Sequence, residues 1–331
     1  MELINFDRIH WQLKVNYGAT TELVDNLIDT GFGDFPEEVI QIGKSIVAEY
    51  VSGVLSVSQN PIRGKLLSFI KSQGGKEECS LYRSNLKTDR YNAAFYNGTL
   101  CRLSGAEHPE DYLYYTSIVV PAALTVAEKE IKEGKRVIEA VVLGVETMLR
   151  LKDAAKTVPK QRGLDPTSTF GPFGSAVATA KILGYDAEFF EDTLSLCPSQ
   201  SAGAFRSSYY NDGDSGYLTS GFASSYGIRC AYLAEKGLSG PRGILEGNMG
   251  YFECISGLHD DNTTPRYDIS CINNDFGNTW QICRLKNKSV KDLFKEFPNV
   301  DVIRKIVFLI ENLEQLDNTG ILINYLRNTG E

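Results

Sequence analysis

The chain has 331 residues, of which 42% are hydrophobic, enough to bury a core larger than that of one average domain. Its formal net charge is −8, and its charged residues are interspersed, whereas phosphate binding needs clustered Lys and Arg, so we expect neither nucleic acid nor an anionic membrane as a partner. No apolar run approaches the roughly 18 residues that span a bilayer, and residues 1–7 carry acids where a secretory signal is basic, which favours a cytoplasmic protein.

Cysteine and histidine usage argues against a metal centre. The seven cysteines are an odd number without a C-x-x-C pair, which is typical of reduced, mostly buried thiols in a cytosolic protein. The three histidines, at positions 10, 108 and 259, are too few and too scattered for a His-rich metal site. We therefore expect no bound metal.

Helix signals begin near position 34 and recur along the chain. Asp34 and Pro36 open a first helix, whose apolar residues return every three or four positions as far as Val54. Pro121 is expected to start another helix, and Gly134 is expected to end it.

The next three helices differ in the kind of surface that they present. Residues 136–151 are almost wholly apolar, which predicts a helix buried on most sides, in a domain centre or in a subunit interface. Residues 172–183 are rich in small side chains suited to close helix packing, and Gly184 ends that helix. Asp186 caps the following helix, which stops before Pro198.

The last third of the chain is expected to continue as helices. Residues 218–236 form one helix, closed by Gly237, and two shorter helices follow at residues 302–313 and 320–326. Clean alternation of polar and apolar residues is nearly absent, so we expect no substantial sheet. The stretch 259–290 is polar and irregular, as a linker or small insertion would be.

Four segments together resemble one known family. Residues 92–99, NAAFYNGT, look like its NAA-x-x-NG-T helix, and residues 165–174, DPTSTFGPFG, resemble its HPTGTFGPFG signature. Residues 117–124 are similar to the helix after its HPG turn, and residues 240–247 match its GP-x-x-ILEG loop. Order and spacing agree over roughly residues 20–255, so the chain resembles the 2-methylcitrate dehydratase / cis-aconitate decarboxylase family, also called MmgE/PrpD.

The resemblance implies a mainly α fold, an all-helical domain that in the family carries an α+β lid domain. A full member is considerably longer, so we expect the lid to be deleted or reduced to a short insertion. Residues 1–258 are then the helical domain, 259–290 an irregular remnant of the lid or a linker, and 291–331 the C-terminal helices that rejoin the helical domain. Family members are typically homodimers that use no cofactor, and we expect both properties here.

The residues that carry the family's acid and base chemistry are mostly replaced in this chain. The His of the HPG turn matches Tyr114, which Tyr115 follows, and the His of the HPTGTFGPFG signature matches Asp165. In the segment that resembles the K-x-x-H-x-G element, Gly216 and Thr219 stand where the family has Lys and His. The family's aspartate-rich loop matches residues 104–108, in which an acid and a histidine are partial replacements.

Two interpretations of these replacements stay open. In the first, the polar groups run different chemistry on a less anionic substrate, and desolvation beside aromatic rings raises the pKa of Asp165 so that it acts as acid or base. In the second, Asp165 is a helix N-cap before Pro166, and the loop at residues 107–108 is a solvated turn. The candidate catalytic residues are Asp165, Tyr114, Tyr217, Thr219 and His108.

Some of the substrate-binding candidates lie in the tyrosine-rich loop that precedes residue 216, and two lie elsewhere in the chain. Arg206 in this loop either binds a substrate carboxylate or carbonyl through two hydrogen bonds or is an ordinary surface arginine. The candidate substrate-binding residues are Arg206, Glu107, Tyr115, Tyr209 and Tyr210.

The leading functional hypothesis is a cofactor-independent lyase, isomerase or cyclase. It acts by acid/base chemistry on a small or medium metabolite other than the family's usual tricarboxylates, as in specialised metabolism. One alternative is a non-catalytic dimeric scaffold or binding protein that kept the fold. The other is a weak enzyme of the 2-methylcitrate dehydratase kind.

Overall fold

The computed structural model describes residues 18–57, 60–107, 109–209, 213–257, 265–286, 288–298 and 300–329. Within them the chain is mainly helical, as predicted, with one antiparallel pair of two-residue strands, β1 (Cys79–Ser80) and β2 (Lys87–Thr88), and no further sheet. The helices are α1 (Ala19–Asp29), α2 (Glu37–Ser56), α3 (Pro61–Gln73), α4 (Arg90–Ser104), α5 (Thr116–Glu130), α6 (Gly134–Ala155), α7 (Val158–Gln161), α8 (Pro166–Leu183), α9 (Ala187–Leu196), α10 (Arg206–Tyr209), α11 (Ser215–Ala234), α12 (Tyr251–Ser256), α13 (Val290–Phe294), α14 (Asp301–Glu311) and α15 (Gly320–Asn328).

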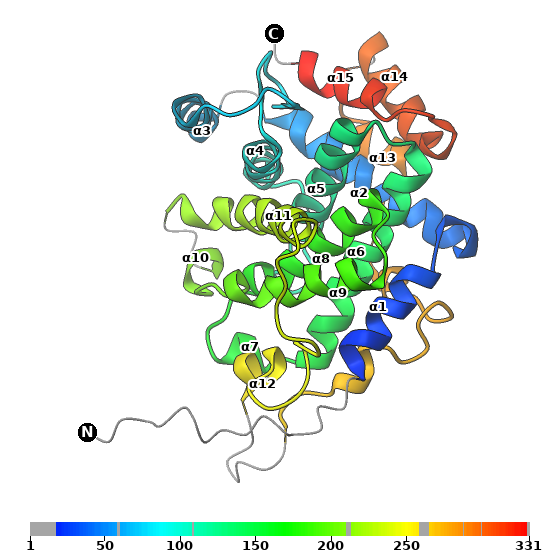
Figure 1. The fold of residues 1–331 in the computed structure, drawn as a ribbon. Coiled ribbons are helices and arrows are strands. Elements are labelled where there is room, and N and C mark those ends of the chain that lie inside the picture. Colours follow the sequence, from blue (N-terminus) through cyan, green and yellow to red (C-terminus); the bar gives the residue numbers. More distant parts are fainter. Residues whose placement is uncertain are drawn as a thin grey trace.

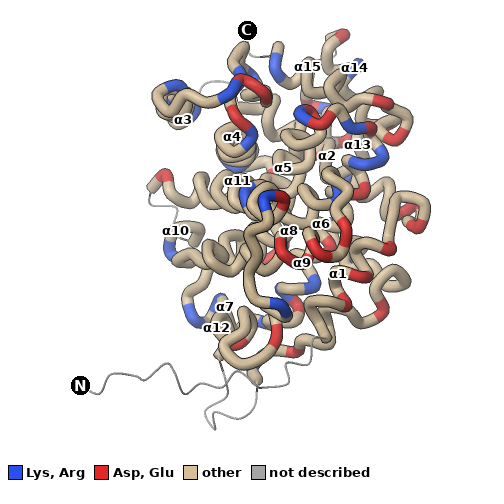
Figure 2. Tube along the Cα trace, in the orientation of Figure 1, with Lys and Arg blue, Asp and Glu red and all other residues tan. Residues whose placement is uncertain are grey.

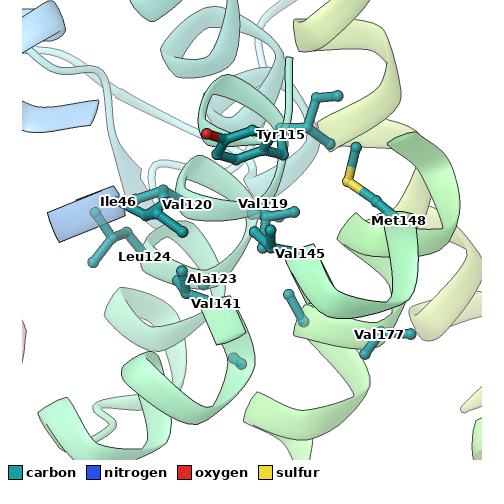
Figure 3. Close-up of a cluster of buried hydrophobic side chains, with 14 of the residues drawn as sticks. Ile46, Tyr115, Val119, Val120, Ala123, Leu124, Val141, Val145, Met148 and Val177 are labelled. Atoms are coloured by element: carbon teal, nitrogen blue, oxygen red, sulfur yellow. The ribbon is translucent and has the colours of Figure 1, made fainter. Parts of the chain in front are cut away.

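Helices α6 and α8 lie in the middle of the molecule, and the other long helices pack around them (Figure 1). Helix α8 contacts α5, α6, α9 and α11, while α2 and α4 close the bundle over α5. The close-up in Figure 3 shows aliphatic side chains from α2, α5, α6 and α8 meeting in one buried cluster. Although α14 and α15 are far away in sequence, they return to contact α2, and α15 also contacts α5.

The apolar helix predicted at residues 136–151 is α6, and it occupies the centre of the chain. Every residue in the range 137–151 is buried by the chain itself. Burial of this apolar surface is the main stabilising term of the fold. Because α6 has no apolar face left to offer a second subunit, it gives no support to a homodimer, which stays a prediction.

Glycines let the central helices approach one another more closely than side chains would allow. A Cβ on Gly221 of α11 would lie 2.3 Å from the carbonyl oxygen of Phe95 in α4, and one on Gly98 would lie 2.7 Å from the carbonyl oxygen of Ser117 in α5. Gly144 of α6 approaches the backbone of α8 in the same way. In the helix predicted at residues 172–183, a Cβ on Gly174 would lie 2.4 Å from the side chain of Met148 and 2.9 Å from the carbonyl oxygen of Gly144, which confirms that small residues there serve close packing.

Two helices begin earlier than the prolines Pro121 and Pro172 predicted. Helix α5 starts at Thr116 and α8 at Pro166, so Pro121 and Pro172 lie inside their helices. A proline inside a helix lacks the N–H that would bond to the carbonyl four residues earlier, which costs stability but does not end a helix held by burial on all sides. Both helices are buried almost throughout, and the start signal that operates in α8 is the cap at Asp165.

The prediction that Gly134 ends a helix is wrong, because Gly134 is the first residue of α6. Helix α5 ends at Glu130, and Ile131 takes the left-handed conformation after it, at φ 51°. A Cβ on Gly134 would lie 1.7 Å from the carbonyl oxygen of Leu313, so the glycine is required by packing. The first helix is also shifted: Asp34 lies in a 3₁₀ turn, and Pro36 is the residue before α2.

Other terminal signals are confirmed. Gly184 follows α8 with a left-handed φ of 72°, and the side chain of Asp186 accepts a hydrogen bond from the amide of Phe189 at the start of α9. Among the described helices, none has the length and apolar character needed to cross a membrane. Acidic and basic residues are spread over the described part of the trace, in keeping with the interspersed pattern of the sequence (Figure 2).

The part of 259–290 that the structure describes is irregular, with two short 3₁₀ turns, and hydrogen bonds to a buried ion pair of α6 hold it against that helix. Arg150 donates a 2.6 Å hydrogen bond to Glu146 one helical turn earlier, and both side chains are buried. The guanidinium also donates to three carbonyl groups between residues 272 and 279, and the carboxylate accepts from two amides at residues 281 and 282.

Candidate functional site

A cavity of about 510 Å³ lies between the N-terminal half of α8, one face of α11 and the loop 200–207. Its α11 side is formed by residues that recur at helical spacing from Thr219 to Arg229. Hydroxyl groups dominate its polar lining, contributed by Ser168, Ser207, Ser215, Thr219, Ser225 and Tyr226. We call it the main cavity.

The backbone fixes the loop of the main cavity against α8. The amide of Asp165 donates to the carbonyl of Gly203 at 2.8 Å, and the amide of Phe205 donates to the carbonyl of Gly163 at 2.8 Å. A Cβ on Gly203 would lie 2.6 Å from the side chain of Ser168, so glycine is what allows this approach. The wall of the cavity is thus set by the chain segment that contains Asp165.

Asp165 serves as the N-cap of α8 and is fully buried. Its Oδ2 accepts hydrogen bonds from the amide and the hydroxyl of Ser168, at 2.8 and 2.7 Å. Burial raises the pKa of the carboxyl, while Ser168, Ser208 and Arg102 act in the opposite direction. Oδ2 therefore acts as the helix cap that the second interpretation predicted. The other oxygen, Oδ1, is buried and accepts no hydrogen bond from the described residues.

Glu107 is a second buried carboxyl, and it is not among the residues that line the main cavity. Its Oε1 accepts a hydrogen bond from the amide of Ser117 at 3.1 Å, and Oε2 has no hydrogen bond within the described part of the chain. Burial raises the pKa of this group to about 7, against the opposing effects of Arg102 and Ser117, and the neighbouring carboxylate of Glu49 raises it further. A carboxyl with this pKa exchanges its proton near neutral pH. The solvated turn considered for residue 107 is not what the structure shows, because Glu107 is 7% exposed.

Arg102 is the functional candidate that sequence reasoning missed. Its guanidinium carbon lies 3.3 Å from the centroid of the Tyr114 ring, a cation–π contact, and its charge lowers the pKa of both Glu107 and Asp165. Its burial among residues 93–102 of α4 follows from the fold, and a charged residue that is buried there needs partners.

A hydrogen bond between two hydroxyl groups links α5 to α11, one face of which lines the main cavity. Ser117 stabilises the Glu107 carboxylate, and its Oγ donates to the Oγ of Ser220 at 2.9 Å. Ser220 is next to Thr219, which lines the main cavity. We use the name acid cluster for Arg102, Glu107, Tyr114 and Asp165, which lie behind the wall rather than in it.

The structure separates the remaining sequence candidates into three places. Thr219 lines the main cavity and donates to the carbonyl of Gly216 at 2.9 Å, and Tyr217 is half-buried in the first turn of α11. Tyr115 is 3% exposed and lies among the core side chains of Figure 3, where burial raises its pKa.

Arg206 and Tyr209 are exposed on the short helix α10, beside the loop of the main cavity. The ring of Tyr209 packs on those of Tyr112 and Phe205, with centroids 6.0 and 5.5 Å away. His108 and Tyr210 lie outside the described residues, and so do the other two histidines. Within the described ranges no group of three or more His, Cys, Asp or Glu side chains is placed to hold a metal ion.

Comparison with known proteins gives consistent matches. The model of the MmgE/PrpD N-terminal domain matches residues 21–264. The cis-aconitate decarboxylase-like protein oryM of Aspergillus oryzae is 24% identical over 283 residues, which cover 82% of this chain and 58% of that protein. A cis-aconitate decarboxylase of Aspergillus terreus is 25% identical over 243 residues, which cover 71% of this chain and 49% of the relative. The chain therefore spans about half the length of the curated relatives that it matches.

Proposed function

The chain belongs to the MmgE/PrpD family, and from this premise we propose that it acts as a lyase-type enzyme that works by proton transfer, without metal or organic cofactor. The observation that carries the proposal is the buried carboxyl of Glu107, with a pKa of about 7 and an unpartnered oxygen, beside Arg102 and behind the main cavity. Relatives named as decarboxylases support the reaction class.

The acid cluster is suited to a reaction that builds negative charge on the substrate. Glu107 takes up and returns a proton at neutral pH, and the hydroxyls of Ser117 and Ser220 extend from it toward the cavity wall. Arg102 supplies a fixed positive charge in a desolvated place, where electrostatic stabilisation is strong. Asp165 holds the first turn of α8, and with it Ser168, in position at the wall.

The lining of the main cavity favours a substrate with less negative charge than a tricarboxylate. Among its described lining residues, Arg229 is the one with a positive charge, and the rest of the polar lining is hydroxyl and amide groups. Three carboxylates would be poorly compensated there, since buried charges need partners. We propose a mono- or dicarboxylate of a small or medium metabolite as the substrate.

The proposal is tested by turnover of a panel of hydroxy and unsaturated mono- and dicarboxylic acids, followed by NMR for loss of water or carbon dioxide, isomerisation and ring closure. For an acid that turns over, Glu107→Gln is expected to lower the rate by about 10²–10⁴. For cis-aconitate and 2-methylcitrate we expect negligible turnover. A Glu107→Gln variant with wild-type rate, or a kcat of about 1–1000 per second on either tricarboxylate, contradicts the proposal.

A non-catalytic binding protein is the second candidate, favoured by one observation. Gly216 and Thr219 stand where the family has Lys and His, and Asp165 has a sufficient structural role as a cap. Binding of an acid to the main cavity, with no turnover of any member of the panel, would support this candidate over the enzyme. The homodimer is checked separately, by light scattering at micromolar concentration.

A further inference from the structure

The two ends of the main cavity are lined by different parts of the helices that border it. Helices α8 and α11 run side by side in the same direction. A Cβ on Gly171 of α8 would lie 2.9 Å from the side chain of Ala223 in α11. Further along both helices, a Cβ on Gly227 would lie 2.4 Å from the backbone nitrogen of Ala176. The first turns of both helices therefore line one end of the cavity, and Arg229 of α11 lines the other.

Hydroxyl groups line the end of the main cavity where the two helices begin. Ser168 lies in the first turn of α8, and Ser215 and Thr219 lie in the first two turns of α11. Ser207 is held beside them, since a Cβ on Gly216 would lie 2.5 Å from its carbonyl oxygen. A hydroxyl group both donates and accepts hydrogen bonds, so this end suits a neutral polar group such as a hydroxyl or a carbonyl.

Arg229 brings a positive charge to the opposite end of the main cavity. Its guanidinium carbon lies 4.6 Å from the centroid of the Tyr91 ring, which supports the side chain from α4. Arg90 approaches the same ring and is paired with Glu78 at 2.6 Å, whereas Arg229 has no ion pair within the described part of the chain. The described residues that line the cavity include no carboxylate. The charge of Arg229 is therefore left for a ligand.

Two hydroxyl-bearing side chains accompany the guanidinium at this end. Ser225 and Tyr226 precede Arg229 by four and three residues, which places them on the same face of α11, and all three line the main cavity. The hydroxyl of Tyr226 is hydrogen-bonded to that of Ser199 at 3.0 Å. A guanidinium binds a carboxylate through two parallel hydrogen bonds, and the carboxylate oxygens can also accept from hydroxyl groups. The group suits a carboxylate.

We propose that Arg229 binds the carboxylate of the substrate, while a neutral polar group at the far end of the molecule lies among the hydroxyls near Thr219. The inference rests on the proposed function and narrows its substrate class to carboxylic acids whose second polar group is several bonds away. Along α11 the two residues are about 15 Å apart, and the arginine side chain leans back toward the start of the helix, which shortens the gap. A compact hydroxy acid with its polar groups on neighbouring carbons does not reach both ends.

Isothermal titration with 8-hydroxyoctanoate and its primary amide tests the role of the charge without requiring turnover. Arg229 is exposed, so we expect the acid to bind about 5–10-fold more tightly than the amide, between the effect of an exposed ion pair and that of a charge-assisted hydrogen bond. Arg229→Gln should remove this difference, and Arg229→Lys should keep part of it. The matched control is Arg304→Gln, which changes an exposed arginine of α14 outside the cavity and should leave the difference intact.

The melting temperature of each variant, measured first, separates a loss of binding from a loss of fold. A folded Arg229→Gln variant that still prefers the acid to the amide as strongly as the wild type overturns the proposal.

The position of the second polar group is tested with a pair of isomers. The acids 8-hydroxyoctanoate and 2-hydroxyoctanoate have the same composition and charge, but only the first can carry its hydroxyl to the end near Thr219. We expect it to bind about 2–10-fold more tightly, the effect of one hydrogen bond. Equal Kd values for the two isomers contradict the proposal.

The inference and the proposed function fail in different ways. A preference for the acid that disappears in Arg229→Gln, without turnover of any acid, defeats the proposed function and leaves the inference standing. Turnover of an acid with the same KM in Arg229→Gln as in the wild type does the reverse.

Discussion

Replacing Arg150 by methionine is expected to destabilise the protein strongly, because the guanidinium is a buried point of attachment between α6 and a distant segment. It is 1% exposed and donates to Glu146 at 2.6 Å, and to the carbonyls of Ile272, Asn274 and Thr279 at 3.1, 2.9 and 2.6 Å. Removing one partner of a buried ion pair costs about 3–5 kcal/mol, since the other charge stays buried without compensation.

This loss of stability can be measured as a lower melting temperature. At about 2 °C per kcal/mol, the low end of the scale for larger chains, Arg150→Met should lower Tm by roughly 6–10 °C. Circular dichroism at a fixed protein concentration measures the shift. Hydrogen exchange should also show faster exchange of the amides of Gln281 and Ile282, which donate to Glu146 at 3.0 and 2.9 Å.

A matched control and a double variant separate this explanation from a general loss of charge. Arg304→Met removes an arginine whose ion pair with Asp301 is exposed at 64% and 80%, and it should change stability by less than about 0.5 kcal/mol. Adding Glu146→Gln to Arg150→Met should recover part of the loss, because the uncompensated charge is removed. A Tm within about 2 °C of wild type for Arg150→Met would refute the reasoning.

Three further predictions test the site and the helix packing. Asp165→Asn should keep the cap and the stability of α8, whereas Asp165→Ala should cost about 0.5–2 kcal/mol in thermal unfolding; equal losses would contradict a cap. The folded pKa of Glu107 is raised from 4.5 to about 7, so ionisation costs the native protein on the order of 3 kcal/mol as pH rises through that window. Glu107→Gln escapes this cost, and its Tm relative to wild type should rise between pH 5 and pH 8; a constant difference would contradict the shifted pKa. Gly221→Ala should cost about 1–3 kcal/mol through its clash with the backbone of α4, while Gly64→Ala, with open space around it in α3, should stabilise by up to about 1 kcal/mol.

Periodicity and caps predicted α2, α6, α9 and α11 because both signals are local, whereas no prediction covered α1 or α3. The apolar run of α6 and the cap at Asp186 depend on residues within a turn or two of each other. The prolines misled for the same reason: a local rule places Pro121 at a helix start, but burial of the whole of α5 overrides it.

The partners of the buried charges were not predictable in this way. Arg150 is bonded to carbonyls 122 to 129 positions further along the chain. A linear pattern shows only that a charge interrupts an apolar helix, not what compensates it. Arg102 was missed on the same ground, since its neighbours Tyr114 and Asp165 come from separate segments.

Two residues of the motifs that carry the family resemblance fix the backbone in this chain. Asn97 accepts from the amide of Tyr82 and donates to the carbonyl of Ser80, each at 3.0 Å, so it holds the strand segment on α4. Glu246 accepts from the amides of Gly18 and Thr20 and thereby caps α1.

The fold requires such residues whatever reaction the protein catalyses. Their presence therefore indicates the fold and gives no information on activity. The family's His and Lys positions are the ones that differ here, at Tyr114, Asp165, Gly216 and Thr219. A scaffold that keeps its structural contacts while its reactive positions change can still place a proton donor at the cavity. We propose that role for the buried carboxyl of Glu107, which is why the decisive variant is Glu107→Gln and not a change in a family signature.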